Sequence, residues 1–269
     1  MKIFTNKNDL LKTIDNEKNL GFVPTMGTIH DGHISLIKKS KSQSKKTIVS
    51  IFINKPQFNK KKDFQKYPRS IIKDTLILKK NKIDYLFVPK MRQMYPNGIN
   101  KKIKIISFAK KLCGKFRPGH FEAIVDIVDR FIKIIKPEKV FLGEKDMQQL
   151  KILKSFVKDK YPKIEIIGCK TIREKNGIAL SSRNSLLSNK EIIIASKIYK
   201  LLKINKNNII NKKITTKYLN RIILNYGVKK IDYVKIFDVN KLSKPHIKKK
   251  QYRIFLAYYL GSTRLIDNI

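Results

Sequence analysis

The chain has 269 residues, with 61 lysines and arginines against 20 aspartates and glutamates, a formal net charge of +41. This length allows one large domain or two modest ones, and the 42% of apolar residues excludes an intrinsically disordered chain despite the charge. No apolar run approaches the ~20 residues of a membrane span, and residues 1–11 lack the apolar core of an export signal, so we expect a cytoplasmic protein. Two cysteines, Cys113 and Cys169, are too few for a disulfide framework and are expected to be free thiols.

The positive charge is spread along the whole chain. The first 170 residues hold 39 basic and 15 acidic side chains, and the last 99 residues hold 22 and 5. Only nine of the basic residues are arginine, the residue that planar recognition of phosphates and bases favours. Lysine, isoleucine and asparagine are encoded by A/T-rich codons, and our hypothesis is that much of the charge reflects genomic base composition. We therefore expect no specific nucleic-acid partner, although the field attracts anionic substrates.

The first 170 residues predict an α/β fold. Apolar, β-branched runs predict strands over residues 20–23, 47–53, 83–88, 140–142 and 163–168, with a further strand over residues 103–108. Apolar residues at helical spacing predict helices from Ile34 to near Lys45 and over residues 69–82, 121–135 and 146–161. Strands that alternate with helices indicate βαβ units and a largely parallel sheet.

A different pattern begins near residue 170. We expect a hairpin around residues 175–177, helices over 190–202 and 215–226, and strands over 233–238, 252–260 and 263–266. The stretch 203–213, rich in lysine, asparagine and isoleucine, is interpreted as an exposed helix end and loop. These elements predict two domains, residues 1–170 and a smaller α+β domain of residues 171–269.

The segment PTMGTIHDGH, residues 24–33, follows the first predicted strand and opens the first helix. In a doubly wound sheet ligands bind at such strand ends, where glycines let the backbone approach a phosphate and a helix start offers free N–H groups to an anion. His30 and His33 could both face that phosphate and donate hydrogen bonds to charge that builds at phosphorus. The alternatives are a metal-binding pair or a turn with two exposed histidines.

Polar clusters recur after two later strands. Asn54 and Gln57 are neutral polar groups suited to hydroxyl and carboxylate recognition, unless the segment is a plain turn around Pro56. Lys145 could neutralise a phosphate and Asp146 could accept from ribose hydroxyls, although Asp146 could also cap the following helix. Both clusters would lie at the same edge of the sheet as the two histidines.

A fourth cluster, LSSRN at residues 180–184, places two hydroxyls and a guanidinium in three successive positions. Such a set binds phosphate well, and the alternative is a loop with a capping serine. The sequence has no G-x-x-x-x-G-K-[ST] phosphate loop, no G-x-G-x-x-G and no H-E-x-x-H. The four clusters together favour an ATP-using enzyme with a phosphate-centred transition state.

The order and spacing of these blocks resemble the pantoate–β-alanine ligase (pantothenate synthetase) family, within the HxGH nucleotidyltransferase superfamily. The matching blocks are PTMGTIHDGH, RPGHF at 117–121, FLGEKDMQQL at 141–150 with Leu142 as an extra apolar residue, LSSRN, and RLIDN at 264–268. The resemblance spans nearly the whole chain. It implies a Rossmann-like domain that binds ATP and pantoate, a smaller C-terminal lid domain that covers the site, and a homodimer.

The resemblance also implies a reaction. ATP would activate (R)-pantoate as pantoyl adenylate with release of diphosphate, and the amine of β-alanine would then displace AMP to give pantothenate, a precursor in coenzyme A biosynthesis. Mg²⁺ would accompany ATP, and the protein would need no metal site of its own. The alternative is another nucleotidyltransferase with a phosphorylated acceptor, but such an acceptor would call for cations where this chain has Gln57 and Gln149.

Residue roles follow from the same resemblance. His30, His33 and Lys145 would be catalytic, the imidazoles stabilising charge at the α-phosphate and His33 serving as proton donor. Gln57 and Gln149 would clamp pantoate, with Asn54 near the region shared with β-alanine. The residues expected at the ATP site are Met26, Gly27, Thr28, Ile29, His30, Asp31, Gly32, His33, Gly143, Glu144, Lys145, Asp146, Ile172, Leu180, Ser181, Ser182 and Arg183. Among these, Met26 and Ile172 would contact the nucleotide through the backbone, and Gly143 and Asp146 would bind the ribose side.

The chain departs from the family pattern at two positions. Lys55 separates Asn54 from Pro56, where the family usually has proline directly after the asparagine, so the turn could differ and Lys55 would add a charge near the site. Ala123 replaces a glycine that usually follows the RPGHF block, at a cost of ~1 kcal/mol if the position requires close approach of the helix or a positive φ.

Overall fold

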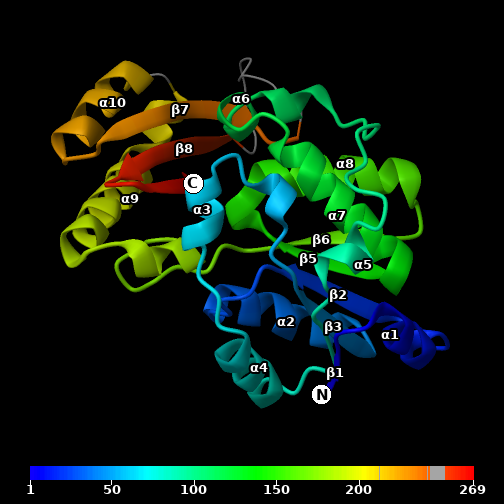
Figure 1. Cartoon of the computed structure of the whole chain (residues 1–269). Coiled ribbons are helices and arrows are strands. Elements are labelled where there is room, and N and C mark those ends of the chain that lie inside the picture. The colour runs from blue at the N-terminus through cyan, green and yellow to red at the C-terminus, as the bar shows by residue number, and fades with distance from the viewer. Residues whose placement is uncertain (212, 241, 243–251) are drawn as a thin grey trace.

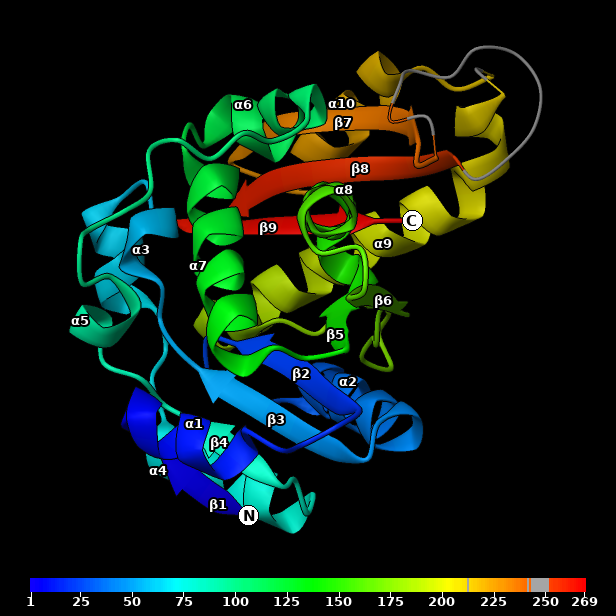
Figure 2. The same ribbon diagram turned by 90° about the vertical axis from the view of Figure 1, so that its right-hand side faces the viewer.

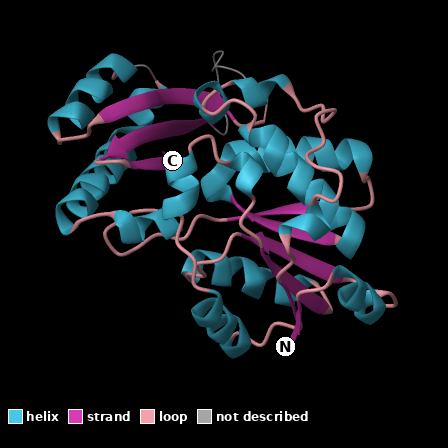
Figure 3. Cartoon of the chain, viewed as in Figure 1, coloured by secondary structure: helices cyan, strands magenta, loops and turns pink. Residues whose placement is uncertain are grey.

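The computed structural model of the protein describes residues 1–211, 213–240, 242 and 252–269 (Figure 1). Its larger sheet has six strands in the order β1-β4-β3-β2-β5-β6, and every pairing is parallel. The strands are β1 (Lys2–Phe4), β2 (Leu20–Thr25), β3 (Lys46–Ile51), β4 (Tyr85–Phe87), β5 (Lys139–Gly143) and β6 (Glu165–Cys169). The expected α/β class and the Rossmann-like parallel sheet are confirmed (Figure 3).

Helices cover both faces of this sheet because its strands are apolar on both sides. Alternate residues of each strand enter opposite cores: Phe22 packs on the face covered by α1, α7 and α8, and Val23 on the face covered by α2 and α4. The helices of this part are α1 (Lys7–Ile14), α2 (Asp31–Gln43), α3 (Lys61–Lys66), α4 (Ile71–Lys80), α5 (Met91–Met94), α6 (Cys113–Phe116), α7 (His120–Ile135) and α8 (Met147–Lys160).

The C-terminal part is a three-stranded antiparallel sheet with two helices. Its elements are α9 (Asn189–Ile210), α10 (Thr216–Asn225), β7 (Lys230–Asp238), β8 (Tyr252–Leu260) and β9 (Thr263–Asn268). Residues of one sheet face, such as Ile254, pack under α9 and α10, whereas Phe237 and Phe255 on the other face join the main core. The ring of Phe237 meets that of Phe108, in the 3₁₀ turn Ser107–Lys110, edge to face at 5.6 Å, which joins the small sheet to the main core. Figure 2 shows the small sheet at the other end of the molecule from β1.

Most of the predicted elements are confirmed, with displaced ends. The hairpin is present as an antiparallel bridge between Arg173 and Ala179, with Gly177 at φ +93° in its turn. The parallel sheet ends at Cys169, and the domain boundary near residue 170 stays a prediction. No helix in the described part of the chain is long and apolar enough to cross a membrane.

Two predictions about local structure are wrong. Residues 103–106 form no strand, and Ser107–Lys110 is a 3₁₀ turn, because the isoleucines of that run pack on the main core without a strand partner. The helix predicted to end at residue 202 continues to Ile210, since Ile209 is buried under the C-terminal sheet; residue 212 lies outside the described residues. The sequence analysis also missed β1 and α1 at the chain start.

The strand order creates a switch point between β2 and β5. From β2 the chain winds outward through β3 and β4, and from β5 it winds the other way to β6. Connections therefore diverge at the carboxyl ends of these two neighbouring strands, which leaves a crevice suited to a ligand. The histidine segment follows β2 at this point, and the segment from Gly143 to Asp146 follows β5.

Candidate active site

A cavity of about 330 Å³ lies at the switch point, between the strand ends of the parallel sheet and the C-terminal sheet. Its wall brings together four clusters that are widely separated in the sequence. The predicted site residues in the wall are Met26, His30, Gly32, His33, Asn54, Gln57, Gly143, Lys145, Asp146, Gln149, Ile172, Leu180, Ser181, Ser182 and Arg183. Gly27, Thr28, Ile29, Asp31 and Glu144 are not part of this wall.

His30 and His33 stand together at the start of α2. Their rings stack with centroids 4.1 Å apart and planes inclined by 29°. The Nδ1 atom of His30 accepts a hydrogen bond of 3.1 Å from the Gly32 backbone and so caps the helix. A side chain at position 32 would collide with that ring, since an ideal Cβ would lie 2.8 Å from the His30 Cε1 atom.

The hydrogen bond to Gly32 determines where His30 carries its proton. Since Nδ1 is an acceptor, the neutral ring must carry its proton on Nε2. Burial and the nearby Lys145 lower the pKa of His30, and burial, His30 and Lys145 lower the pKa of His33 to about 3. Both rings are therefore neutral at physiological pH and can donate a hydrogen bond without carrying charge.

The loop before these histidines is held from below by Asp74 of α4. The Asp74 carboxylate is 2% exposed and accepts hydrogen bonds of 2.7 Å from the backbone N–H groups of both Thr28 and Ile29. Gly27 and Thr28 have φ values of +84° and +54°, and the paired bonds stabilise this left-handed turn. Because Asp74 occupies both N–H groups, these two amides are not available to a phosphate.

Asn54 and Gln57 form a joined pair after β3. The Asn54 side chain is 1% exposed and donates hydrogen bonds of 3.1 Å to the Gln57 Oε1 atom and to the Ala123 carbonyl. Its own Oδ1 accepts a 2.6 Å bond from the Tyr95 hydroxyl. The Nε2 atom of Gln57 lies 3.1 Å from the Met26 sulfur. The polar atoms of Asn54 all have protein partners, so Asn54 supports Gln57.

The RPGHF block fixes the backbone of Gln57. Its carbonyl accepts from Arg117 Nη2 at 3.1 Å and from His120 Nδ1 at 2.9 Å. The second His120 nitrogen therefore accepts from Arg117 Nη1, at 2.9 Å, which keeps the ring neutral. Burial and Arg117 hold the pKa of His120 well below its usual range, and burial together with Arg183 lowers the pKa of Arg117 to about 10.

The segment after β5 is tied to the end of the chain. The buried Asn268 side chain donates to the carbonyls of Glu144 and Lys145 at 2.9 and 2.8 Å. The Glu144 carboxylate turns away from the cavity to accept a 2.6 Å bond from Arg253. Asp146 does not cap α8 with its side chain; its carboxylate lies 3.8 Å from the Lys145 ammonium. Thus Lys145 and Asp146 keep their side chains in the cavity wall.

The serine–arginine cluster closes the site from the C-terminal side. Ser181 caps its own 3₁₀ turn by accepting from the Arg183 backbone, and Ser182 lies in the cavity wall together with Tyr67. The Arg183 guanidinium forms a 3.1 Å ion pair with Asp63 of α3. This pair connects the two parts of the molecule across the cavity.

The wall also contains polar residues that the sequence analysis did not assign. Arg117, His120 and Arg264 belong to blocks that match the family, whereas Tyr67, Asp63 and Tyr233 carry no local signal. Cys113, also in the wall, lies 3.0 Å from the Tyr233 hydroxyl and 3.7 Å from both terminal nitrogens of Arg264. The expectation of free thiols is confirmed for Cys113 and Cys169.

The two departures from the family pattern cause no strain at the site. Pro56 stands inside a short 3₁₀ turn, Lys55–Gln57, whose first turn accepts proline readily. The ammonium of Lys55 lies 5.9 Å from the Phe64 ring centroid and is not part of the cavity wall. Ala123 lies inside α7 and is not among the residues with positive φ in the described part of the chain.

The parallel sheet, the cavity at its switch point and the histidine pair at a helix start define a nucleotide-binding enzyme of the Rossmann-like class. The pantoate-beta-alanine ligase family model matches residues 2–269, and the chain belongs to this family. It is 37% identical to the pantothenate synthetase of Sulfurihydrogenibium sp. (strain YO3AOP1), covering 100% of this chain and 99% of that protein. Identity to the pantothenate synthetase of Buchnera aphidicola subsp. Acyrthosiphon pisum (strain Tuc7) is 43%, covering 94% and 91%.

Solved structures agree with this assignment. The crystal structure of pantothenate synthetase from Thermus thermophilus superposes with a TM-score of 0.91 at 29% identity, covering 100% of this chain and 99% of that one. The pantoate-beta-alanine ligase of Francisella tularensis, complexed with beta-gamma ATP and beta-alanine, gives a TM-score of 0.83 at 38% identity, covering 100% and 97%.

Proposed function

We propose that this chain catalyses the ATP-dependent condensation of (R)-pantoate with β-alanine, which yields pantothenate, AMP and diphosphate. A pantoate carboxylate oxygen attacks the α-phosphorus of ATP, and diphosphate leaves. The amine of β-alanine then attacks the acyl carbon of the pantoyl adenylate, and AMP leaves. Family membership over the whole chain supports this reaction.

One structural observation carries the proposal. His30, His33, Lys145 and Arg183 share a single cavity with the amides of Gln57 and Gln149. The first four groups suit the phosphates of ATP, and neutral amides suit an unphosphorylated hydroxy acid. Holding the acid and the nucleotide in line is worth up to ~7–11 kcal/mol of the barrier. A phosphorylated acceptor would instead need cations at the two glutamine positions.

The histidines act as neutral donors in this scheme. The Nε2–H of His30 can bond to an oxygen on the α-phosphorus as negative charge develops there, and a well-aimed donor of this kind is worth ~3–4 kcal/mol. The depressed pKa values of His30 and His33 keep both rings in that form. The Lys145 ammonium supplies the positive charge, and Ser181, Ser182 and Arg183 supply further donors to the phosphates.

The residues present suit Mg²⁺ that arrives with ATP. Such an ion takes most of its ligands from phosphates and water and needs only one or two carboxylates. Asp146 offers one in the cavity wall, 3.8 Å from Lys145 and free of any capping role. The described residues contain no group of three or more histidine, cysteine or acidic side chains that could hold a metal by themselves. When bound, Mg²⁺ neutralises charge on the phosphates.

The C-terminal sheet gives the intermediate a shelter from water. Phe255, Leu265 and Asn268 line the cavity opposite the parallel sheet. Exclusion of water protects a mixed anhydride from hydrolysis until the amine arrives. We further propose that the enzyme works as a homodimer in the cytoplasm, which the family resemblance supports; size-exclusion chromatography with light scattering tests the dimer.

A two-stage assay tests the function. Purified protein with ATP, Mg²⁺ and pantoate should release diphosphate, and addition of β-alanine should yield AMP and pantothenate in equal amounts. A nucleotidyltransferase with another acceptor would release no diphosphate in response to pantoate, and a protein without ligase activity would release none under any of these conditions. Either result would refute the proposed function.

A further inference from the structure

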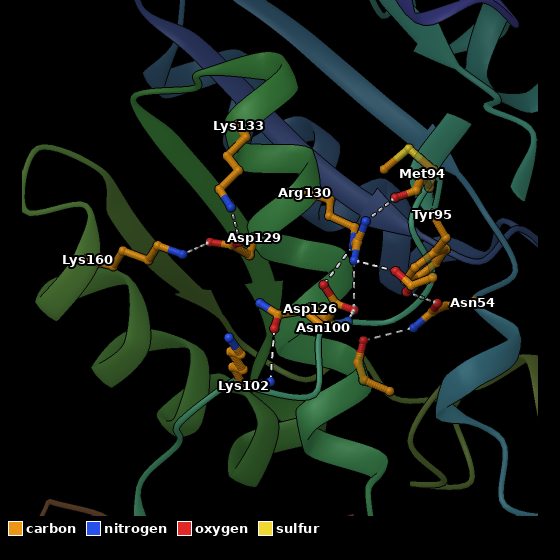
Figure 4. A network of polar contacts seen from close by, with 12 residues as sticks. Asn54, Met94, Tyr95, Asn100, Lys102, Asp126, Asp129, Arg130, Lys133 and Lys160 are labelled. Carbon is orange, nitrogen blue, oxygen red and sulfur yellow. Dashed lines mark hydrogen bonds and ion pairs between the residues drawn. The ribbon is translucent and has the colours of Figure 1, made fainter. Parts of the chain in front are cut away.

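A polar network behind the cavity wall leads from α7 to Asn54 (Figure 4), and Asn54 is hydrogen-bonded to Gln57. Tyr95, which directly follows α5, is 9% exposed and does not line the cavity. Its hydroxyl donates a 2.6 Å hydrogen bond to Asn54 Oδ1, and Asn54 donates in turn to Gln57. The Tyr95 ring also lies 6.3 Å from that of Phe52, an apolar residue of the cavity wall, but its hydrogen bond reaches the site through Asn54.

The chemistry of the partners determines how the Asn54 amide is oriented. The Ala123 carbonyl can only accept, so the atom of Asn54 that faces it must be Nδ2. The Oδ1 atom then faces Tyr95, whose phenol must donate. Burial and the nearby Asp126 raise the pKa of Tyr95, so that the phenol keeps its proton across the physiological range.

The same logic extends to Gln57. The second Nδ2 hydrogen of Asn54 points to Gln57, so the Gln57 atom at 3.1 Å must be the acceptor Oε1. Its Nε2 group is left for the Met26 sulfur and for a ligand in the cavity. Gln57 can therefore offer a ligand N–H groups, and the ligand atom that meets it must be an acceptor.

Tyr95 is itself held on both sides by α7. Arg130 donates to the carbonyls of Met94 and Gly98 at 2.7 and 2.9 Å, and its guanidinium carbon lies 4.4 Å from the Tyr95 ring centroid. Asp126, paired with Arg130 at 2.7 Å, accepts from the Asn100 backbone at 2.9 Å. The segment that carries Tyr95 is thus clamped before and after the tyrosine (Figure 4).

We propose that Tyr95 is a positioning residue that acts through Asn54 to fix Gln57 as a hydrogen-bond donor toward pantoate. The inference rests on the proposed function, since it takes pantoate as the acid bound at Gln57. Without the phenol, the buried Asn54 Oδ1 loses its donor and the amide is free to turn, so Gln57 loses its fixed orientation. The binding of pantoate is then weakened, and the contacts to the nucleotide stay in place.

Tyr95→Phe tests this relay, with Tyr161→Phe as the matched control. Tyr161 donates its hydroxyl to Asp129 at 2.7 Å, outside the cavity wall, and Asp129 keeps its two lysine partners. Initial rates of diphosphate release are measured while pantoate and then ATP is varied. We expect Tyr95→Phe to raise the KM for pantoate at least fivefold with the KM for ATP within twofold, and Tyr161→Phe to change neither by more than twofold. If Tyr95→Phe changes the KM for pantoate and the KM for ATP by the same factor, or changes neither, the proposal is overturned.

Gln57→Glu tests whether Gln57 donates a hydrogen bond to pantoate or accepts one from it. This test does not depend on whether Tyr95→Phe folds. A carboxylate can still accept from Asn54 but cannot donate to pantoate, so we expect the KM for pantoate at pH 7.5 to rise at least fiftyfold, with the KM for ATP within threefold. A KM for pantoate within threefold of the unchanged chain would show that Gln57 accepts there and would overturn the relay. If the chain without substitutions makes no pantothenate, both the proposed function and this inference are refuted. If it makes pantothenate and the variants behave otherwise than expected, only the inference about Tyr95, Asn54 and Gln57 is refuted.

Discussion

The imidazole rings of His30 and His33 are stacked at the start of α2, with their centroids 4.1 Å apart. This contact keeps the two rings in one orientation above the helix N-terminus, where the positive end of the helix dipole and Lys145 disfavour a charged imidazole. The buried His33 Nδ1 atom has no hydrogen-bond partner within the described ranges. The stacked pair is thus a set of neutral hydrogen-bond donors at the point where negative charge would develop.

Replacement of His33 should slow adenylate formation while the fold persists. His33→Ala removes one donor to the α-phosphate, and loss of a single such donor costs ~10²–10³ in rate. Diphosphate release with ATP and pantoate, before β-alanine is added, measures this step. Circular dichroism and a melting curve serve as the control for folding. Near-unchanged diphosphate release from the folded variant would contradict the role given to His33.

The same histidine should make the protein sensitive to acid. Folded His33, with a pKa of about 3, stays unprotonated below pH 6.5, where the histidine of the unfolded chain binds a proton. The free energy of unfolding is therefore highest above pH 6.5 and falls as the pH drops toward 3, by up to ~1.4 kcal/mol per pH unit. Burial also lowers the pKa of His120, which therefore changes the free energy of unfolding in the same direction. Urea unfolding at pH 7.5, 6.0 and 5.0 measures the slope; His33→Gln should flatten it, and an equal slope in that variant would refute the assignment.

Asp63 should compete with ATP for Arg183. The 3.1 Å pair between them occupies the Nη2 group of Arg183, which is then not free to contact a phosphate. Because the Asp63 side chain is 38% exposed, the pair is weak, and Asp63→Asn should lower the KM for ATP only about two- to fivefold. Asp159→Asn, which removes the same charge from an exposed position of α8, controls for the general field. A higher KM for ATP in Asp63→Asn would instead mean that Asp63 itself supports the nucleotide.

Most of the correct predictions came from segments of consecutive residues. The strand–glycine–helix context identified the positions of His30, His33 and Lys145, because local residue types determine where a strand ends and a helix begins. The serine–arginine cluster was identified by its residue types alone. The same rules placed all the strands of the parallel sheet except β1. That strand has only three residues and two of them are exposed, so its pattern is too short to detect.

Long-range partners could not be predicted in the same way. Asp74 reaches Thr28 and Ile29 from a helix 45 residues further along the chain, and Tyr95 reaches Asn54 across 41 residues. Nothing in the neighbourhood of either residue marks it, since its partner depends on how α4 or α5 packs on the sheet. Five residues were predicted at the ATP site and lie outside the cavity wall. Their placement could not be predicted for the same reason, because adjacency in the chain does not decide which side of a loop faces the ligand.

Loss of the Asp74 carboxylate should loosen the nucleotide loop. Asp74→Asn leaves one acceptor for two backbone N–H groups and places an amide donor against the other, which costs about 1–3 kcal/mol of unfolding free energy. The KM for ATP should rise severalfold because the left-handed turn before His30 loses its support. Asp84→Asn is the matched control, since Asp84 also accepts from a backbone amide, that of Thr47, away from the cavity. Equal KM values for ATP in the two variants would refute a link between Asp74 and the site.

Asn268 should control Lys145 from the end of β9. Its amide donates to the Glu144 and Lys145 carbonyls at 2.9 and 2.8 Å, so Asn268→Ala leaves both without this donor and frees the segment that carries the lysine. We expect a fall in kcat for adenylate formation of about tenfold and a loss of about 1–3 kcal/mol in unfolding free energy. Ser196→Ala, which removes a buried hydroxyl bonded to the Asn176 carbonyl at 2.7 Å, should lose stability but keep its rate. If both variants lose stability and neither loses rate, the bonds from Asn268 hold the two sheets together without orienting Lys145.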